Sequence, residues 1–569
     1  MASFVILFVA IVASLLTLLM VMGAREPAFF FVTAGTATTG TATTGTAKAR
    51  PVTTKPVAGS LTTEPVGIYD LNLYNSGALG QNPNRTFHSS KIVAPKFGIN
   101  IWDAEHLRAH SLPFLFLTAT EPDSSASPFI LNATDLSLVW ADTTTHRDAA
   151  MNFRPQTYRG EKFLSFWEGI NASGRGNGVC VLYDQSYQER YRVTAKDLGF
   201  GADLHECKLT HDGTALITVY NLVQYNLTAV GGQDYDQLLD CYFQEIDVET
   251  GDVLFSWAAS DWFSPKDSYE QYKPNYDFFH LNSVQKDRNG NYLISSRHLH
   301  TIALIAGNGT ETPGEPIWKL NGKQNQFHDL SGGDALDFSW QHHARFRNDE
   351  GTEITLFDNH HPSNVPGKTG CTLSCSKAMA VRLNFENMTV SLVAEYAHPQ
   401  SVQSGSMGSF QALDAEGVAN GNLVVGWGSN PGVTEYTQDG KCVMDIQFGA
   451  YSPGYKFGHT VSSYRAFKGD WIGRPTTDPD LSTNWAAHEI YVSWNGATEV
   501  RSWAVYAGDK AKNDVVAVRH RRNVAKDGFE TAIRVPQHSW VEVRGLDING
   551  KVLGSTGVWE YKRNVKVAL

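Results

Sequence analysis

The sequence has a modest share of charged residues and no long basic run. Asp, Glu, Lys and Arg make up 18% of the 569 residues, and the formal net charge is −11. Nucleic-acid-binding proteins usually present a strongly basic patch, so this composition argues against a nucleic-acid partner. The acidic balance mainly favours solubility. A glycine-rich phosphate-binding fingerprint is also missing, which argues against a nucleotide ligand.

Cysteine is scarce as well. The six cysteines are Cys180, Cys207, Cys241, Cys371, Cys375 and Cys442. An even number in an exported protein predicts some disulfides, and Cys371 with Cys375 would close a small loop. A zinc site is the alternative for this pair, but structural zinc usually needs a second close pair of ligands, which the sequence lacks.

Long apolar runs are confined to the beginning of the chain. Phe4 to Met22 is almost unbroken apolar sequence of membrane-anchor length, and Gly23 offers a small residue for signal cleavage. Residues 1–24 are therefore a signal peptide or a membrane anchor. Both alternatives place the chain in the secretory pathway, either secreted or tethered through Phe4–Met22 with its bulk on the lumenal or extracellular side. The Thr/Ala/Gly-rich stretch at 25–65 cannot bury a core and is predicted to be a linker.

Sequons for N-glycosylation support export. Six Asn-x-Ser/Thr triplets occur in the chain, and their acceptor residues are Asn84, Asn132, Asn171, Asn226, Asn308 and Asn387.

Long helical periods are missing too. From about residue 112 the chain alternates short apolar strands with turn signals such as HDG, RNGN and DEG. Units of several tens of residues, each with room for four strands, predict an all-β fold in which 66–480 is a six-bladed β-propeller. A pair of sandwiches is the competing architecture. Residues 481–569 read as a small β-sandwich-like extension, or as strands packed onto the propeller.

Histidines occupy equivalent positions in successive units of this repeat. The first turns of three consecutive units contain Asp212, Asp287 and Asp349, and the residues seven positions earlier are His205, His280 and His342. The innermost strands of a propeller surround its axis. These histidines are therefore predicted to converge at one mouth of a central channel.

A second polar set follows on the returning strands. Alignment on the turn glycines Gly213, Gly290 and Gly351 superposes two further triplets, which are Tyr220, Arg297 and Asp358, and then Asn221, His298 and Asn359. A single histidine at a strand end is often only a buried hydrogen-bonding group, but three at one phase favour a clustered site. Because neighbouring side chains on a strand alternate, His343 is expected to be structural. His361 precedes proline and is a weaker candidate than His360.

Several imidazoles beside a guanidinium suit an anion or a developing oxyanion. Histidine acts as a nucleophile or as an acid or base near neutral pH, and arginine offers several donors to an oxyanion. Three histidines would also suit a transition metal. The only carboxylates near this phase are Glu206 and Asp358, so neither a metal nor another cofactor is predicted.

Several segments resemble the arylsulfotransferase family, specifically its fungal branch. They include DLHECKLTHDGTALITVYN, DFFHLNSVQKDRNGNYLISSRH, FSWQHHARF, FDNHH and GNLVVGWGSNPGVTEY, between about 200 and 480. The resemblance implies a six-bladed propeller with its active site at a channel mouth. It also implies transfer of a sulfuryl group between phenolic compounds through a transiently sulfated histidine, with no nucleotide sulfate donor and with small phenols or aryl sulfates as partners.

The resemblance carries over two residues by motif, His280 and His342. With the residues that the repeat aligns, the predicted catalytic set is His280, His342, His205, Arg297 and His360, and the predicted substrate-binding set is Tyr220, Asn221, His298, Asp358, Asn359 and Trp427. Two departures from the bacterial pattern stand out. His360 follows Asn359 where bacterial members approach an arginine, and residues 405–428 contain no histidine to match the bacterial nucleophile.

Two other functions fit the same residues. A propeller enzyme of secondary metabolism would use the histidines for proton transfer in a cyclisation or isomerisation. A secreted propeller without catalysis would use the channel mouth only as a binding surface.

Overall fold

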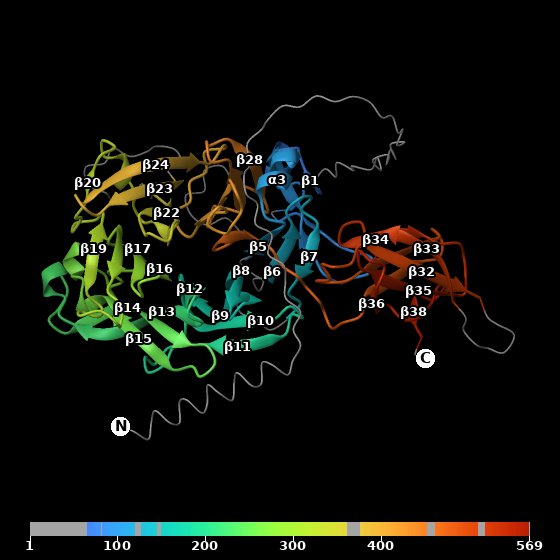
Figure 1. Ribbon diagram of the computed structural model, residues 1–569, viewed down its shortest axis with the longest axis horizontal. Coiled ribbons are helices and arrows are strands. Elements are labelled where there is room, and N and C mark those ends of the chain that lie inside the picture. Colours follow the sequence, from blue (N-terminus) through green and yellow to red (C-terminus); the bar gives the residue numbers. More distant parts are fainter. Residues whose placement is uncertain are drawn as a thin grey trace, which may run out of the picture. The chain divides into compact units, whose positions relative to one another are not determined.

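The computed structural model describes residues 65–80, 82–119, 127–144, 149–360, 376–451, 461–509 and 518–567. In these ranges the regular secondary structure is almost entirely β-strand, with short α-helices at α2 (Leu71–Asn75) and α3 (Ala104–His110) (Figure 1). No helix among these residues has the length and apolarity needed to cross a membrane. The apolar segment Phe4–Met22, the cysteine pair Cys371 and Cys375, and His361 lie outside the described residues.

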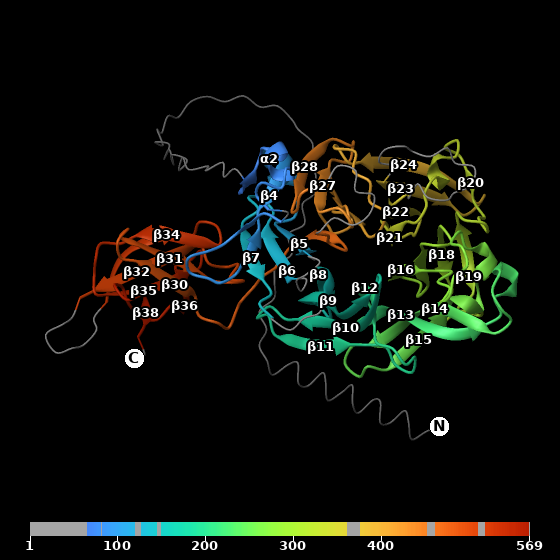
Figure 2. The same cartoon turned by 180° about the vertical axis from the view of Figure 1, so that it is seen from behind.

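Six sheets succeed one another around a common centre. In each sheet one edge strand faces the centre and is here called the inner strand. Each inner strand contacts the inner strands of the two neighbouring sheets, so the six sheets form a closed ring (Figures 1 and 2). The inner strands are β8 (Ala150–Tyr158), β12 (Asp203–Leu209), β16 (Leu281–Lys286), β21 (His342–Phe346), β25 (Ser409–Ala412) and β29 (Ala466–Gly469). This part of the fold is therefore propeller-like.

Four of the sheets come from continuous stretches of chain. Each runs outward from its inner strand through antiparallel neighbours. Their outer strands are β9 (Glu161–Ala172), β10 (Arg175–Tyr183) and β11 (Glu189–Val193); β13 (Thr214–Tyr225), β14 (Asp236–Asp247) and β15 (Val253–Ala258); β17 (Tyr292–Ser296), β18 (Thr301–Ile305) and β19 (Pro316–Leu320); and β22 (Glu353–Asp358), β23 (Lys377–Asn384), β24 (Thr389–Ala397) and the parallel edge strand β20 (His328–Asp329).

The other two sheets combine distant parts of the chain. β29 pairs with β5 (Phe114–Ala119), which continues to β6 (Ser127–Asn132) and β7 (Leu138–Ala141). The sheet of β25, β26 (Leu423–Gly426), β27 (Gly432–Tyr436) and β28 (Cys442–Gln447) is extended by β4 (Phe97–Trp102) and β1 (Gly67–Ile68). The stretch that includes β5, β6 and β7 thus supplies three strands of this sheet, and its inner strand, β29, comes from Ala466–Gly469. A short hairpin of β2 (Asn84–Arg85) and β3 (Ala94–Pro95) lies outside these sheets.

The C-terminal residues form two further sheets. One contains β30 (Asp480–Asn484), β31 (Glu489–Ser493) and β34 (Glu530–Arg534). The other contains β32 (Ser502–Gly508), β33 (Arg519–Ala525), β35 (Trp540–Leu546), β36 (Val552–Ser555), β37 (Trp559–Glu560) and β38 (Val565–Lys566). Ile490 of the first sheet and Trp503 of the second belong to one buried apolar core. The two sheets therefore pack as a small sandwich.

Neighbouring sheets of the ring are held together by apolar side chains. Leu293 on β17 and Ile302 on β18 share one core with Ile354 and Leu356 on β22 of the next sheet. Val, Ile, Leu and aromatic residues dominate the strands because each sheet is covered on both faces by its neighbours. The inner hairpins turn at Gly213, Gly290 and Gly351, whose φ angles of 79°, 86° and 70° favour glycine.

Four of the inner strands are irregular near their N-terminal ends, and these ends lie at the same height along the axis of the ring. Four inner hairpins shift register there, and the shifts fall between Met151 and Arg154, Asp203 and Cys207, Leu281 and Ser283, and His342 and Arg345. A β-bulge leaves an extra residue on one strand and redirects its side chain, and such bulges are frequent beside functional sites. The irregular level is also the level of the three phased histidines.

Candidate active site at the starts of the inner strands

His205, His280 and His342 lie at the starts of three consecutive inner strands. The ring centroids of His205 and His280 are 4.9 Å apart. The Tyr464 ring lies 5.7 Å from that of His205 and 6.4 Å from that of His342. All three histidines are largely buried, and His280 has the most exposed side chain, at 13%. The structure thus gathers these three residues into one group, here called the histidine cluster.

Buried carboxylates orient two of the three rings. Nδ1 of His205 lies 2.5 Å from Oδ1 of Asp203, and Nδ1 of His280 lies 2.6 Å from Oδ2 of Asp277. Both carboxylates have no exposed surface. A carboxylate at Nδ1 fixes the tautomer with the proton on that nitrogen and leaves the Nε2 lone pair available. Among the described hydrogen bonds, none engages Nε2 of His205 or His280.

His342 is held in a different way. Its Nδ1 lies 2.6 Å from Oδ1 of Asn359, and its Nε2 accepts a hydrogen bond of 3.3 Å from the backbone N–H of Met407. Asn359 is fixed in turn, because its amide donates to the carbonyls of Ser404 and Met407 at 2.9 Å. Both ring nitrogens of His342 therefore have protein partners, so His342 is less free to react than His280.

Arg297 and His298 border the cluster in the turn that follows β17, the next strand of the sheet that begins with His280 and β16. Nη1 of Arg297 lies 3.0 Å from Nε2 of His298, and its guanidinium stacks 4.8 Å from the Trp340 ring centre. Nδ1 of His298 donates to the Asp277 carbonyl at 2.6 Å, and its ring lies 4.6 Å from that of His280. The Arg297 guanidinium thus contacts His298, whose ring in turn packs against His280.

Burial keeps the imidazoles neutral. It lowers the pKa of His280 well below 6.5, although Asp277 opposes the shift. Burial, and then the charge of Arg297, lower the pKa of His342 in the same direction, and burial lowers the pKa of His298 to about 4. Burial would raise the pKa of Asp277, but His280 and His298 outweigh it and hold that pKa well below its usual range. Near neutral pH the site therefore contains neutral imidazoles beside an ionised carboxylate.

Tyr220 forms part of the wall of the site. Its ring centroid is 5.4 Å from that of His205 and 5.7 Å from that of His280. Its hydroxyl donates to the Leu281 carbonyl at 2.8 Å, so it is committed to the protein backbone. Asn221 is the next residue on β13, and because side chains alternate along a strand it points away from the face that Tyr220 occupies.

Three other predicted residues are engaged elsewhere. Asp358 is buried and pairs with His360 at 3.2 Å, with no described contact to the histidine cluster. The indole of Trp427 donates to Thr434 and packs against Phe357 in the apolar core of its sheet. The described contacts of Asp358, His360 and Trp427 are thus with residues outside the histidine cluster, and their part in the site stays a prediction.

Sequence reasoning missed the carboxylates and Tyr464. Asp203 and Asp277 stand two and three residues before their histidines, in DLH and DFFH, and this spacing is the signal that was available. Tyr464 precedes β29, the strand that closes the ring. Its buried hydroxyl has no hydrogen-bond partner among the described residues. No local pattern would have placed it beside His205.

One subset of the site has the composition of a metal centre. Possible ligand atoms of Asp277, His280 and His298 lie within 4.8 Å of one another. However, Arg175 donates to Asp277 Oδ2 at 2.5 Å, and Arg297 lies 3.0 Å from His298. Two guanidiniums in contact with the would-be ligands repel a cation. The arrangement is better suited to an anion held near neutral, nucleophilic imidazoles.

Comparisons with known proteins agree with this chemistry. The model of the arylsulfotransferase (ASST) family matches residues 154–449. No curated protein matches the chain. Among solved structures, a protein of unknown function from Bacteroides caccae is 15% identical with a TM-score of 0.34, and its alignment covers 62% of this chain and 98% of that one.

Two further solved structures are similarly distant. A protein from Lactobacillus plantarum is 11% identical with a TM-score of 0.32, covering 74% of this chain and 98% of that one. A protein of unknown function from Dyadobacter fermentans is 12% identical with a TM-score of 0.33, covering 60% and 89%. Similarities this remote say nothing about function. The family match, by contrast, spans just over half of the chain and includes the strands that carry His205, His280 and His342, so the chain belongs to the arylsulfotransferase family.

Proposed function

We propose that this protein transfers a sulfuryl group from an aryl sulfate ester to a phenol, without a nucleotide sulfate donor. The observation that carries the proposal is the Asp277–His280 pair beside Arg297, within a chain of the arylsulfotransferase family. A neutral imidazole with a carboxylate at Nδ1 is the arrangement that activates a nitrogen nucleophile.

In the first half-reaction, Nε2 of His280 attacks the sulfur of the donor ester. An N–S bond forms, the S–O bond to the aryl group breaks, and the leaving phenolate takes its proton from water, since Nε2 of His205 holds a lone pair and no proton. In the second half-reaction, His205 removes the proton of the acceptor phenol, whose oxygen attacks sulfur. The N–S bond then breaks and its electron pair returns to Nε2. The proton that His205 gains in the second half-reaction returns to water. Asp277 and Asp203 stabilise the positive charge that each ring carries in turn.

Arg297 supplies the positive charge for the sulfuryl oxygens. It is largely buried, and burial lowers its pKa, but a guanidinium remains protonated in proteins. His298 holds Arg297 from one side and the Gly405 carbonyl accepts from its other nitrogen at 3.1 Å. A donor fixed in advance where charge gathers contributes more to the rate than one that must reorganise. His342, with both ring nitrogens engaged, positions the neighbouring loop.

The wider proposal covers architecture and location. The six sheets form a six-bladed β-propeller, and the motifs quoted above support the fungal branch of the family. The secretory pathway is supported by the buried disulfide between Cys180 and Cys207. It is also supported by five exposed sequon asparagines and by a half-buried sixth, Asn132. Phe4–Met22 would act as a signal or a single-pass tether.

A second function draws on the same geometry. Neutral buried imidazoles beside carboxylates also suit proton transfer on a small molecule, as in a cyclisation or isomerisation. The engagement of His342 by Met407 favours this reading, because it leaves two free Nε2 atoms rather than three. Such an enzyme would form product without any sulfate donor.

The test uses the full-length glycosylated protein with a chromogenic aryl sulfate and a phenol acceptor. Without an acceptor, wild type should release about one equivalent of donor phenol and stop, and it should turn over only when an acceptor is present. His280→Ala should lose the burst and at least about 10³-fold in kcat/KM, as expected for a nucleophile. His211→Ala is the matched control, since His211 is half-exposed and pairs only with the surface residue Asp212. Equal activity of wild type and His280→Ala, or no phenol release by wild type, would refute the proposal.

A further inference from the structure

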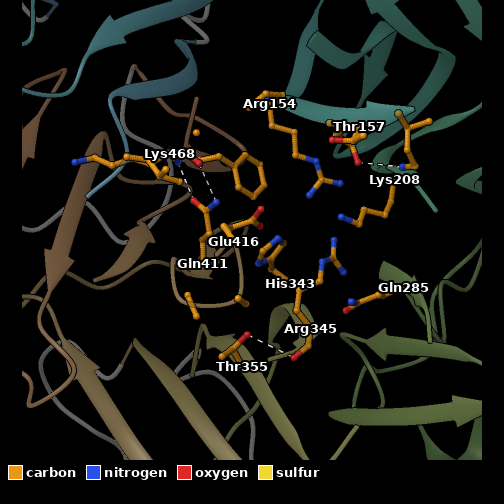
Figure 3. Close-up of a pocket in the computed structure, with 18 of the residues that line it drawn as sticks. Arg154, Thr157, Lys208, Gln285, His343, Arg345, Thr355, Gln411, Glu416 and Lys468 are labelled. Carbon is orange, nitrogen blue, oxygen red and sulfur yellow. Dashed lines mark hydrogen bonds between the residues drawn. The ribbon is translucent and has the colours of Figure 1, made fainter. Parts of the chain in front are cut away.

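A separate cavity of about 510 Å³ lies toward the other end of the inner strands (Figure 3). Every inner strand contributes at least one polar side chain to it, and these include Arg154, Lys208, Gln285, Arg345, Gln411 and Lys468. Lys208 follows His205 on β12 by three residues, and Arg345 follows His342 on β21 by three. At a rise of about 3.3 Å per residue, this cationic chamber lies roughly 10 Å from the histidine cluster. None of the three clustered histidines lines it.

The cations of the chamber outnumber their carboxylates. Lys468 is neutralised by Glu435 at 2.5 Å. In contrast, the single buried carboxylate of Glu206 serves three arginines, Arg345 at 2.5 Å, Arg465 at 3.1 Å and Arg154 at 3.4 Å. The side-chain nitrogen of Lys208 has no hydrogen bond or ion pair with any described residue. Burial, and then the charge of Arg154, lower its pKa to about 7. Glu416, which is exposed at the rim, faces this excess charge without contacting it.

Buried polar atoms of the chamber also lack hydrogen-bond partners among the described residues. His343 is 3% exposed and lines the chamber, and its Nε2 has no hydrogen-bond partner among the described residues. The Nε atoms of Arg154 and Arg345 are in the same situation. Figure 3 shows Arg154, Lys208, Arg345 and His343 reaching into the same space from different strands. Buried polar groups are normally satisfied, so the two guanidinium donors call for an acceptor and Nε2 of His343 calls for a partner.

Part of the chamber wall is apolar. Phe410 and Phe467 line it, and the Arg154 guanidinium lies 4.9 Å from the ring centre of Phe467. A few hundred cubic ångströms with a small number of convergent polar groups is typical of a small-molecule site.

We propose that the cationic chamber binds a small tetrahedral oxyanion, sulfate or phosphate, either free or as the head group of a small ester. Lys208, Arg154 and Arg345 are its principal donors. They converge from three different sheets rather than in one plane, which suits a tetrahedral group better than a flat carboxylate. Arginine and lysine together form the usual oxyanion-binding pair. The site is distinct from the histidine cluster and does not depend on the reaction proposed for it.

The experiment is calorimetric titration of the full-length protein with inorganic phosphate, sulfate and phenyl phosphate at constant ionic strength. Wild type should bind at least one of them, and Lys208→Met should weaken that binding at least about tenfold, the effect of losing one charge-assisted donor. Lys208→Arg should retain binding. Lys162→Met is the matched control, because Lys162 lies on the rim and is already paired with Asp470. Tighter binding of phenyl phosphate than of phosphate identifies an ester as the ligand, and equal binding identifies the free anion.

Two results would overturn the proposal. One is the absence of binding by wild type, and the other is unchanged affinity in Lys208→Met. Misfolding is not expected to obscure the outcome, since removing an unpaired cation relieves repulsion from Arg154 and Arg345, and the free energy of unfolding checks this. The titrations are repeated in His280→Ala, in which the histidine cluster is altered. Binding that is weakened by Lys208→Met should persist in that background, so failure of the sulfuryl-transfer proposal leaves this test intact.

Discussion

Glu206 is the buried counter-ion of three arginines, and its replacement by glutamine should destabilise the protein strongly. The carboxylate has no exposed surface and contacts Arg345, Arg465 and Arg154 at 2.5, 3.1 and 3.4 Å. Burial alone would raise the pKa of Glu206, but the three guanidiniums outweigh it and lower the pKa to about 2 from 4.5. A shift of this size corresponds to about 3 kcal/mol of preference for the ionised form in the folded state.

The substitution Glu206→Gln keeps the shape of the side chain and removes the charge. Three buried arginines would then lack a counter-ion, and breaking a buried ion pair from one side typically costs about 3–5 kcal/mol. The pKa shift of Glu206 and the usual cost of breaking a buried ion pair therefore both predict a loss of roughly 3–5 kcal/mol in the free energy of unfolding at pH 7. Urea unfolding followed by tryptophan fluorescence measures it.

The same prediction has a pH signature. The folded-state pKa lies below the unfolded value, so the contribution of Glu206 is fully present above about pH 4.5 and is lost as the pH falls toward 2. The difference between wild type and Glu206→Gln should thus narrow between pH 4.5 and 3. Glu353→Gln is the control, because its pair with Arg382 is exposed and should contribute at most about 1 kcal/mol. A loss below about 1 kcal/mol in Glu206→Gln would refute the reasoning.

Three further outcomes are expected. Asp277→Asn should lower kcat by about 10²–10⁴-fold because the His280 ring loses its fixed tautomer, while KM changes little; an unchanged kcat would exclude this positioning role. Overall stability should fall as the pH drops from 6.5 to 4, because burial lowers the pKa of His298 and of His398 to about 4, so the unfolded state binds more protons in that window; flat urea midpoints across it would contradict this. Replacing Cys180 and Cys207 by serine together should cost about 3.5 kcal/mol in unfolding free energy, from the loop of 27 residues that the disulfide closes; an unchanged midpoint in wild type treated with reductant would count against it.

The position of each histidine relative to the turn of its repeat was enough to predict which histidines lie close together. The turn glycines Gly213 and Gly290 occupy the same hairpin in successive sheets with positive φ, so counting from the turn locates equivalent residues. His205 and His280 obey this count and meet at 4.9 Å. The repeat encodes this because identical hairpins around one centre place equivalent residues at one level.

The partners of these histidines could not be read in the same way. Asp277 orients His280 through a hydrogen bond that depends on the conformation of the DFFH turn, where His280 itself has a φ of +54°. Tyr464 reaches the site only because β29 returns to pair with β5, a contact between residues more than 300 positions apart. Local propensity carries no information on such closure, since it is decided by which sheet edge remains unpaired.

The adjacent residues His342 and His343 show how one strand contributes to both the histidine cluster and the cationic chamber. In a regular strand the second residue would turn toward the neighbouring sheet. Here the register shifts between His342 and Arg345, and His343 has a φ of +56°. This bulge sends His342 to the histidine cluster and His343 to the cationic chamber, with Glu206 and Arg465 buried between them. Because equivalent bulges occur on β8, β12 and β16, the separation into a level of neutral imidazoles and a level of cations is built into the repeated backbone geometry rather than into one loop. An Ala substitution at His343 should therefore perturb anion binding and leave the reaction at His280 unchanged.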